Sequence, residues 1–353
     1  MSEFPHESWV TDVSSSLRGH FLTTSYDGHL RVFTTSNTQA PTLSAPLHSG
    51  AITSFSLLPS EPLEELTSTI VTSSHDLTAL ISRLDLQTNS CTPLASLHLH
   101  TGPVSSVSTL NTHILTSGWD GLIGFFDVSI PSSDEVPLPA TASTDRKKRR
   151  KIAKDDEVAQ PKRKAPLSVL KSHIGRVSKV LWNGPGKAVS VGFDSTVRTW
   201  DTEMGVCTGN IAASEKPFLG LALSHEQAAL AVSTDRTLTS YDLRMDTLSA
   251  ATASFLHPAT PSCVGVPATA GEGATVNKLQ VATGAYDGVV RIWDMRSTKT
   301  AVALFKAWGG SKNEGKKVLG LEWRGDLLTV GGEGGVDVWK VSGSAGPDER
   351  KSA

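Results

Sequence analysis

Short apolar stretches separated by polar turns run along most of this chain. Near residue 27, the segment HFLTTS (20–25) precedes an Asp-Gly pair, and Leu30, Val32 and Phe33 follow it. Apolar positions that alternate with a period of two are typical of half-buried β-strands. Asp-Gly is typical of a tight turn, because Gly tolerates a positive φ and Asp bonds back to its own backbone. The pattern therefore predicts pairs of short strands joined by tight turns.

The same unit recurs along the sequence. Four segments repeat it closely, with an aromatic residue and an Asp before the turn and an aromatic residue at the end: 25–33, 118–127, 192–201 and 285–294. Weaker copies occupy 73–84, 233–244 and 331–340. Each copy has an acidic residue in its turn, namely Asp27, Asp76, Asp120, Asp194, Asp235, Asp287 and Glu333. The spacing between most consecutive turn acids falls within or slightly above about 40–45 residues, the period typical of WD repeats.

Seven such units predict an all-β fold, a seven-bladed WD-repeat β-propeller. One long step, from Asp120 to Asp194, contains an insertion. The predicted organisation is blades 1–3 in residues 1–128, a disordered basic insertion in 129–166, blades 4–7 in 167–340 and a flexible tail in 341–353. The last blade has three clear strands, at 316–323, 326–332 and 335–340, so we expect its outer edge to be unpaired.

A His precedes the first strand of several units: His6, His48, His100 and His173. The resemblance to WD repeats implies a structural role, in which this His, a Ser or Thr, the turn acid and a strand-ending Trp form a buried hydrogen-bond relay. His6 with Asp27 and His100 with Asp120 fit this pattern, although Phe33 and Phe126 replace the Trp. The fullest version is expected from His173, Asp194 and Trp200.

The sequence contains no GxSxG, phosphate-loop, HExxH or Rossmann motif. Cys91, Cys207 and Cys263 are scattered without metal-ligand spacing, which fits a reducing compartment. No run approaches the roughly 20 apolar residues of a membrane span, and MSEFPHESWV has no apolar signal core. We therefore expect a soluble intracellular protein that is not an enzyme and that needs no cofactor or metal.

The residues directly before the turn acids suggest a binding surface. Four of them are aromatic: Tyr26, Trp119, Phe193 and Tyr286. The turns of a propeller gather on one face, so these rings would either form a rigid docking surface for a partner or fill space between adjacent blades. Two D-x-R boxes, Asp242–Arg244 and Asp294–Arg296, also occur in WD-repeat receptors of cullin ubiquitin ligases. The simpler interpretation of these boxes is a local cap or ion pair.

The formal net charge of −2 conceals a basic insertion. Residues 141–164 contain ten Lys or Arg and four Asp or Glu, whereas the rest of the chain is mildly acidic. Segment 129–166 has no aromatic residue and is rich in Pro, Ser, Ala and charge, a composition that favours disorder. Its basic residues form two clusters: Arg146, Lys147, Lys148, Arg149, Arg150 and Lys151, then Lys162, Arg163 and Lys164. Such clusters indicate a nuclear localisation signal, an RNA contact or an inert solvated spacer.

Several strings in order make the resemblance more specific. FPHESWVTDV, YDGHLRVF, HTGPVSSVS, KKRRK before LKSHIGRVSKVLW, and YDLR resemble the WD-repeat protein 12 or Ytm family of ribosome-biogenesis factors. Membership implies a non-enzymatic scaffold in a trimer with the block-of-proliferation WD-repeat protein and the pescadillo protein. That complex acts on pre-60S particles in large-subunit rRNA maturation, and the implied location is the nucleus, nucleolus and nucleoplasm.

The family also carries an N-terminal ubiquitin-like domain that engages a midasin-type AAA ATPase. This sequence begins five residues before His6, so the resemblance does not extend to that domain, and we do not expect binding to the ATPase. The alternative function from another class is a WD-repeat substrate receptor of a cullin ubiquitin ligase, which would use the two D-x-R boxes.

Overall fold

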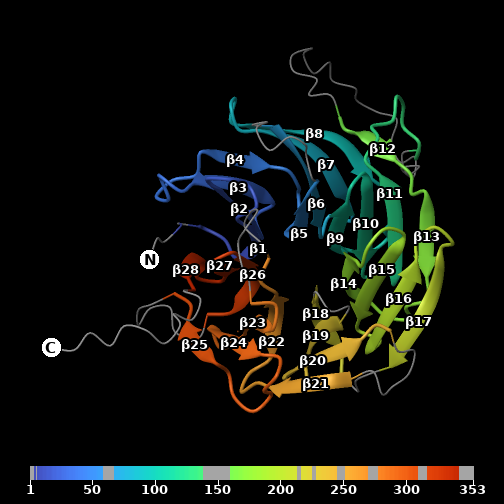
Figure 1. Cartoon of the computed structure of the whole chain (residues 1–353). Helices are drawn as coiled ribbons and strands as arrows, with labels where there is room; N and C mark the ends of the chain where they lie inside the picture. The colour runs from blue at the N-terminus through green and yellow to red at the C-terminus, as the bar shows by residue number, and fades with distance from the viewer. Residues whose placement is uncertain are drawn as a thin grey trace, which may run out of the picture.

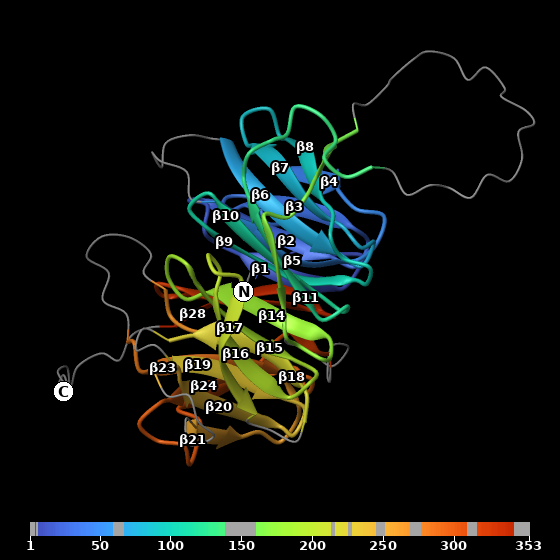
Figure 2. The same ribbon diagram turned by 90° about the vertical axis from the view of Figure 1, so that its right-hand side faces the viewer.

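The computed structural model describes residues 4, 6–58, 67–137, 160–212, 216–224, 228–244, 251–268, 277–308 and 316–341. Within these residues the fold is all-β, and the structure contains no helix long and apolar enough to cross a membrane. Seven sheets, antiparallel except for one parallel strand pair in blade 2, form the blades of a ring, as predicted (Figure 1; the ring is turned by 90° in Figure 2). The ring closes where blade 1 meets blade 7.

The first four blades follow chain order, except that one strand that comes after the first three strands of blade 3 in the sequence pairs with the edge of blade 2. Blade 1 contains β1 (Val10–Ser14), β2 (His20–Ser25), β3 (His29–Thr34) and β4 (Leu43–Pro46). Blade 2 contains β5 (Ile52–Leu57), β6 (Thr67–Ser74), β7 (Ala79–Asp85), β8 (Ser90–Leu97) and β12 (Lys162–Lys164). Blade 3 contains β9 (Val104–Leu110), β10 (His113–Gly118), β11 (Leu122–Asp127) and β13 (Ser168–Lys171). Blade 4 contains β14 (Val177–Trp182), β15 (Lys187–Gly192), β16 (Thr196–Asp201) and β17 (Val206–Ala212).

The other three blades are consecutive in sequence. Blade 5 contains β18 (Phe218–Leu223), β19 (Ala228–Ser233), β20 (Thr237–Asp242) and β21 (Ala251–Leu256). Blade 6 contains β22 (Pro261–Gly265), β23 (Gln280–Ala285), β24 (Val289–Asp294) and β25 (Ala303–Lys306). Blade 7 contains β26 (Val318–Arg324), β27 (Leu327–Gly332) and β28 (Gly335–Lys340).

Two of our expected boundaries are wrong. We assigned residues from 167 onward to blades 4–7, but β13 pairs with β11 and is the outer strand of blade 3. We expected all of 129–166 to be disordered, but β12 pairs in parallel with β8, from Lys162 opposite Ala95 to Lys164 opposite Leu97. The chain therefore leaves blade 3, returns along the outer edge of blade 2, and only then completes blade 3. Residues 138–159 and 342–353 lie outside the described part of the chain.

Blade 7 has the three strands that we predicted, but its outer edge is not wholly unpaired. Phe4 forms an isolated antiparallel bridge with Val336 of β28. The Phe4 side chain is buried against Phe21 and Phe33, at ring-centroid distances of 5.2 and 5.1 Å. Residues close to the N-terminus thus contribute to the apolar core between blades 7 and 1.

A β-bulge near the start of every inner strand sets how the blades join. In β9, for example, Ser106 pairs with Ser117 and Val104 with Gly118, so Ser105 is left out of the ladder. A bulged residue turns its side chain away from the regular register. The Ser105 hydroxyl consequently donates to the Val177 carbonyl of the next blade, at 2.6 Å. Corresponding hydroxyl–carbonyl bonds join blades 2 and 3, 4 and 5, and 6 and 7: Thr53 to Val104, Ser178 to Phe218, and Ser262 to Val318.

The closing seam uses a carboxylate instead. Leu319 occupies the bulge position in blade 7 and has no hydroxyl to donate. Glu322 of β26 accepts hydrogen bonds from the hydroxyls of Ser14, Ser15 and Ser16 of blade 1, at 3.0, 2.7 and 3.0 Å. This charge-assisted group joins the two ends of the ring through side chains.

Candidate functional site

The turn acids lie where the second and third strands of each blade meet. At the first turn, Gly28 has φ 79°, and a Cβ there would lie 2.2 Å from the His48 carbonyl oxygen, so only glycine fits. Leu77, Ser195 and Arg236 adopt a similar positive φ in other blades. The six turn aspartates accept the backbone N–H two residues later, as from His29 to Asp27 at 3.1 Å, whereas Glu333 accepts the N–H of Lys317 at 3.1 Å. The aspartates therefore shape these turns, as Asp-containing turns generally do.

Three blades contain the His–Asp pair of the predicted relay. His173 Nδ1 lies 2.8 Å from Asp194 and its Nε2 lies 2.7 Å from Ser190 Oγ, which also accepts a hydrogen bond from Trp200 Nε1 at 2.8 Å. This is the fullest relay, as we expected. His48 joins Asp76 and Thr72 in blade 2, and His100 joins Asp120 and Thr116 in blade 3.

Burial alone would raise the pKa of the Asp194 carboxyl group. The hydrogen bond and charge of His173, together with the Thr196 hydroxyl and the Ile174 N–H, outweigh burial and lower this pKa to about 2. The pKa of Asp76 falls to about 2 for the same reason, with His48 as its partner. These His–Asp pairs are buried inside the blades, which supports the structural role that we predicted over catalysis.

The predicted pairing of His6 with Asp27 is wrong. His6 Nδ1 lies 3.0 Å from the Phe4 carbonyl oxygen, and its Nε2 contacts Thr23 Oγ1 at 2.8 Å. Asp27 instead pairs with Arg31, four residues further on, at 2.5 Å. A long, always-charged side chain that points back along the same strand satisfies the turn carboxylate without the histidine.

Sequence reasoning missed the corresponding histidine of blade 6. His257 Nε2 lies 2.8 Å from Thr283 Oγ1, which accepts a hydrogen bond from Trp293 Nε1 at 3.0 Å. The turn acid of this blade, Asp287, pairs with Arg291 at 2.7 Å, as in blade 1. The D-G-x-x-R spacing of these two blades was the signal that the acid would use an arginine. Burial lowers the pKa of His257 to about 4, so the imidazole is neutral near pH 7.

The four predicted aromatic residues are exposed on the face formed by these turns. Tyr26 is 45%, Trp119 37%, Phe193 42% and Tyr286 39% exposed. They do not stand alone, because four further side chains connect them. His75 also precedes a turn acid, whereas the other three come directly before inner strands β1, β14 and β26: Trp9, Arg176 and Lys317. We call these eight residues the aromatic belt.

Close ring contacts make the aromatic belt continuous. The Trp9–Tyr26, Tyr26–His75 and His75–Trp119 centroid distances are 5.4, 6.5 and 5.2 Å. Arg176 lies over Trp119 at 4.1 Å and over Phe193 at 5.8 Å. At the other end, Lys317 lies 5.8 Å from Trp9 and 5.4 Å from Tyr286. The exposed fractions leave these rings accessible to a partner, and the contacts between rings of neighbouring blades also fill space between blades, so the structure is compatible with both interpretations.

The D-x-R boxes form local ion pairs. Arg244 Nη2 lies 2.6 Å from its own Asp242, and Arg296 Nη2 lies 2.6 Å from its own Asp294. Each arginine also donates its backbone N–H to the same carboxylate. This is the simpler of the two interpretations that we gave for these boxes.

The second basic cluster is not a free stretch of positive charge. Lys164 is 3% exposed, and its ammonium lies 2.5 Å from Asp127 Oδ1, 2.8 Å from the Ser129 carbonyl oxygen and 2.9 Å from Ser129 Oγ. Arg163 pairs with Asp134 at 2.8 Å. Of the three residues, Lys162 alone is exposed. This corrects our prediction for Lys164, whereas the first cluster, 146–151, lies outside the described residues.

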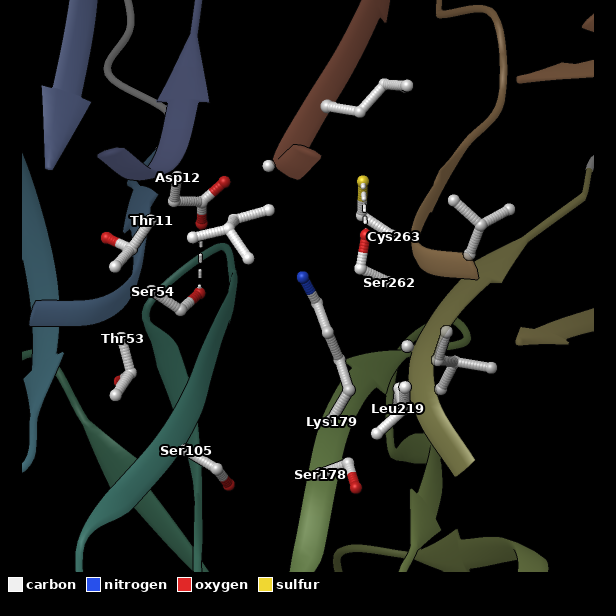
Figure 3. Close-up of a pocket in the computed structure, with 16 residues that line it drawn as sticks. Thr11, Asp12, Thr53, Ser54, Ser105, Ser178, Lys179, Leu219, Ser262 and Cys263 are labelled. Carbon is white, nitrogen blue, oxygen red and sulfur yellow. Dashed lines mark hydrogen bonds between the residues drawn. The ribbon is translucent and has the colours of Figure 1, made fainter. Parts of the chain in front are cut away.

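A small polar cavity of about 140 Å³ occupies the centre of the ring (Figure 3). Lys179 extends from β14 into the space between Asp12 and Ser54 on one side and Ser262 and Cys263 on the other. Asp12 accepts hydrogen bonds from Ser54 Oγ at 3.2 Å and from the Val13 N–H at 3.0 Å. Burial raises the pKa of Asp12, although Lys179 and these hydrogen bonds oppose it. Asp12 thus joins blades 1 and 2.

Comparison with known proteins agrees with this architecture. The WD domain, G-beta repeat family matches residues 2–34, 91–127, 164–201 and 268–294. The chain is 56% identical to ribosome biogenesis protein YTM1 of Coprinopsis cinerea, over 97% of this chain and 75% of the relative. It is 53% identical to YTM1 of Laccaria bicolor with the same coverage, and 27% identical to a WDR12 homologue of Ixodes scapularis over 93% of this chain and 73% of that protein. The chain therefore belongs to the YTM1/WDR12 family of ribosome biogenesis WD-repeat proteins.

Proposed function

We propose that this chain is a non-enzymatic scaffold subunit that acts in ribosome biogenesis. Its partners in this proposal are the block-of-proliferation WD-repeat protein and the pescadillo protein, and its task is large-subunit rRNA maturation and 60S assembly in the nucleolus and nucleoplasm. Family membership supports the process, because the relatives carry the name ribosome biogenesis protein. The resemblance described above is the source of the named partners.

The aromatic belt is the observation that carries the proposal. Exposed Tyr and Trp side chains offer a large contact area at a small cost in side-chain entropy, and they dominate the binding energy of many interfaces. Here the rings are held by one another and by two stacked cations, so little further ordering is required on binding. A face of this kind favours a protein partner over a small substrate.

Affinity purification of the tagged chain from nuclear extract tests the proposal. Recovery of the block-of-proliferation and pescadillo proteins is expected from the wild type and from a Met204→Ala control. Met204 is 74% exposed in the β16–β17 turn, at the opposite end of the strands from the belt. A Tyr26→Ala/Trp119→Ala double variant should lose both partners while keeping its melting temperature.

The same purification decides the alternative function. If the cullin-ligase interpretation holds, ligase adaptors co-purify with the wild type, and an Arg244→Ala/Arg296→Ala variant loses them. Both arginines are exposed, so these substitutions should not unfold the protein. Absence of both ribosome-assembly proteins from the wild-type sample would contradict the scaffold proposal.

We also propose that the first basic cluster, Arg146–Lys151, directs the chain to the nucleus. Six consecutive basic residues suit the acidic surface of an import receptor and equally suit an RNA backbone. Replacing all six with Ala should shift a fluorescent fusion toward the cytoplasm. If the fusion remains nuclear but RNA affinity and its salt dependence fall, the cluster contacts RNA instead.

A further inference from the structure

A second hollow opens beside the aromatic belt. It has a volume of about 170 Å³ and lies between blades 1 and 2 beside the central cavity, with which it shares Leu319 of β26 in blade 7. Ala51 and Leu319 supply apolar surface, and Tyr26 and His75 of the belt stand at its rim. We call this hollow the mouth pocket.

The size of the mouth pocket suits one side chain. Small-molecule sites usually measure about 300–1,000 Å³, which is well above this volume. A protein cavity of about 150 Å³ admits a benzene molecule, so the mouth pocket has room for one aromatic ring or branched aliphatic group. Burial lowers the pKa of His75, so its ring is neutral near pH 7 and presents an uncharged face to such a group.

A cation that forms no ion pair with a carboxylate of the described residues lies close to this pocket. His75 contacts Trp119 at 5.2 Å, and Trp119 lies 4.1 Å from the Arg176 guanidinium. In the described part of the chain, no carboxylate forms an ion pair with Arg176, whereas Lys317 at the other end of the belt pairs with Glu333 at 3.4 Å. Stacking on Trp119 leaves the edge N–H groups of a guanidinium available, and these bind a carboxylate in bidentate fashion.

We propose that the mouth pocket receives one apolar side chain from a surface loop of a protein partner, and that Arg176 pairs with a carboxylate on the same loop. The His75–Trp119 and Trp119–Arg176 distances together equal the length of about three residues of extended chain. The inference rests on the proposed function, and it specifies the chemistry of the partner: an apolar anchor followed closely by Asp or Glu. An anchor in a pocket with a charge pair beside it is typical of an interface hot spot.

The test measures binding to the recombinant propeller of the block-of-proliferation protein by calorimetry or biolayer interferometry. Ala51→Trp should fill the pocket with an indole ring, and Arg176→Glu should repel the carboxylate; each is expected to weaken binding at least tenfold. Arg176→Lys keeps the charge and should weaken binding less. Met204→Trp and Arg18→Glu make the same types of change at exposed positions of the opposite face and should stay within twofold of the wild type.

The outcomes separate this inference from the proposed function. If the wild type binds and both Ala51→Trp and Arg176→Glu bind within twofold of it, the inference is overturned while the scaffold proposal stands. If the wild type does not bind this propeller, both are overturned. If a thermal melt shows that Ala51→Trp does not fold, the Arg176 variants decide the test. An Asp→Lys or Glu→Lys change in the partner that restores binding to Arg176→Glu identifies the paired carboxylate. If no such change restores binding, the pairing is rejected.

Discussion

Replacing Lys164 with Ala should destabilise the pairing of β12 with β8 at the edge of blade 2. The Lys164 ammonium contacts Asp127 and both the backbone and the hydroxyl of Ser129, which belong to the segment that leaves blade 3. Its own strand, β12, is only three residues long. Backbone bonds from His98 to Lys164 and from Glu135 to Arg163 complete the junction. The substitution therefore removes a buried cation that joins the beginning and the end of the insertion.

The expected loss of stability follows from the burial of the two partners. Exposed ion pairs usually contribute less than about 1 kcal/mol, whereas removing one partner of a fully buried pair costs about 3–5 kcal/mol. Lys164 has 4% side-chain exposure and Asp127 33%, so solvent screens the remaining carboxylate in part. We therefore expect Lys164→Ala to lower the free energy of unfolding by about 2 kcal/mol. The pKa of Asp127 should also rise, because burial raises it and Lys164 opposes that effect.

Urea denaturation of the full chain measures this loss, and amide exchange locates it. Lys162→Ala is the matched control, because Lys162 is exposed on the same strand and has no such contact in the described structure. In Lys164→Ala, faster exchange should be confined to β12 and its neighbour Ala95–Leu97. Equal free energies of unfolding for the two variants, to within about 0.5 kcal/mol, would refute the reasoning, since surface substitutions have effects of that size.

Three further outcomes are expected. Asp194→Ala should lower stability by roughly 1–3 kcal/mol because it leaves buried donors unpaired, whereas Asp145→Ala in the insertion should have no measurable effect in the same melt. Between pH 6.5 and 4, His257 binds a proton in the unfolded chain but not in the folded chain. The contribution of neutral His257 to the free energy of unfolding is therefore complete above pH 6.5 and is lost as the pH falls to 4. A series of melts over this range should show a loss of up to about 3 kcal/mol, which His257→Gln should reduce. Replacing Arg146–Lys151 with Ala should leave the melting temperature unchanged while nuclear fluorescence falls.

The sequence predicts the blades of this fold better than the contacts inside them. Asp-Gly turns and alternating apolar positions depend on local backbone geometry, so the positions of the strands around Asp27 and Asp287 follow from short segments. The hydrogen-bond partner of each turn acid does not follow from a short segment, because a histidine and an arginine can both reach the acid. In blade 1 the arginine is four residues away on the next strand and reaches the acid, while His6 bonds to the Phe4 carbonyl instead.

The insertion shows a second limit of sequence reasoning. Composition averaged over 129–166 predicts disorder, but the three residues of β12 are ordered by the edge of β8 and by Asp127, which lie outside that window. Similarly, the position of Arg176 next to Trp119 could not be predicted from their separation in sequence. Residues before inner strands and residues before turn acids meet only because the antiparallel blades bring both sets to one face.

The recurrent bulge shows how the ring would hold the proposed docking face in place. Each bulge comes directly after the residues that project onto the belt face, such as Trp9 before β1 and Arg176 before β14. In four of the seven blades the bulged hydroxyl bonds to the next blade close to the belt, as Ser178 does with Phe218. Because neighbouring blades are fixed to each other so close to the surface, the spacing of the aromatic side chains is determined by the ring itself. A partner can therefore contact several blades at once without paying for their relative ordering, which is the physical requirement of a scaffold.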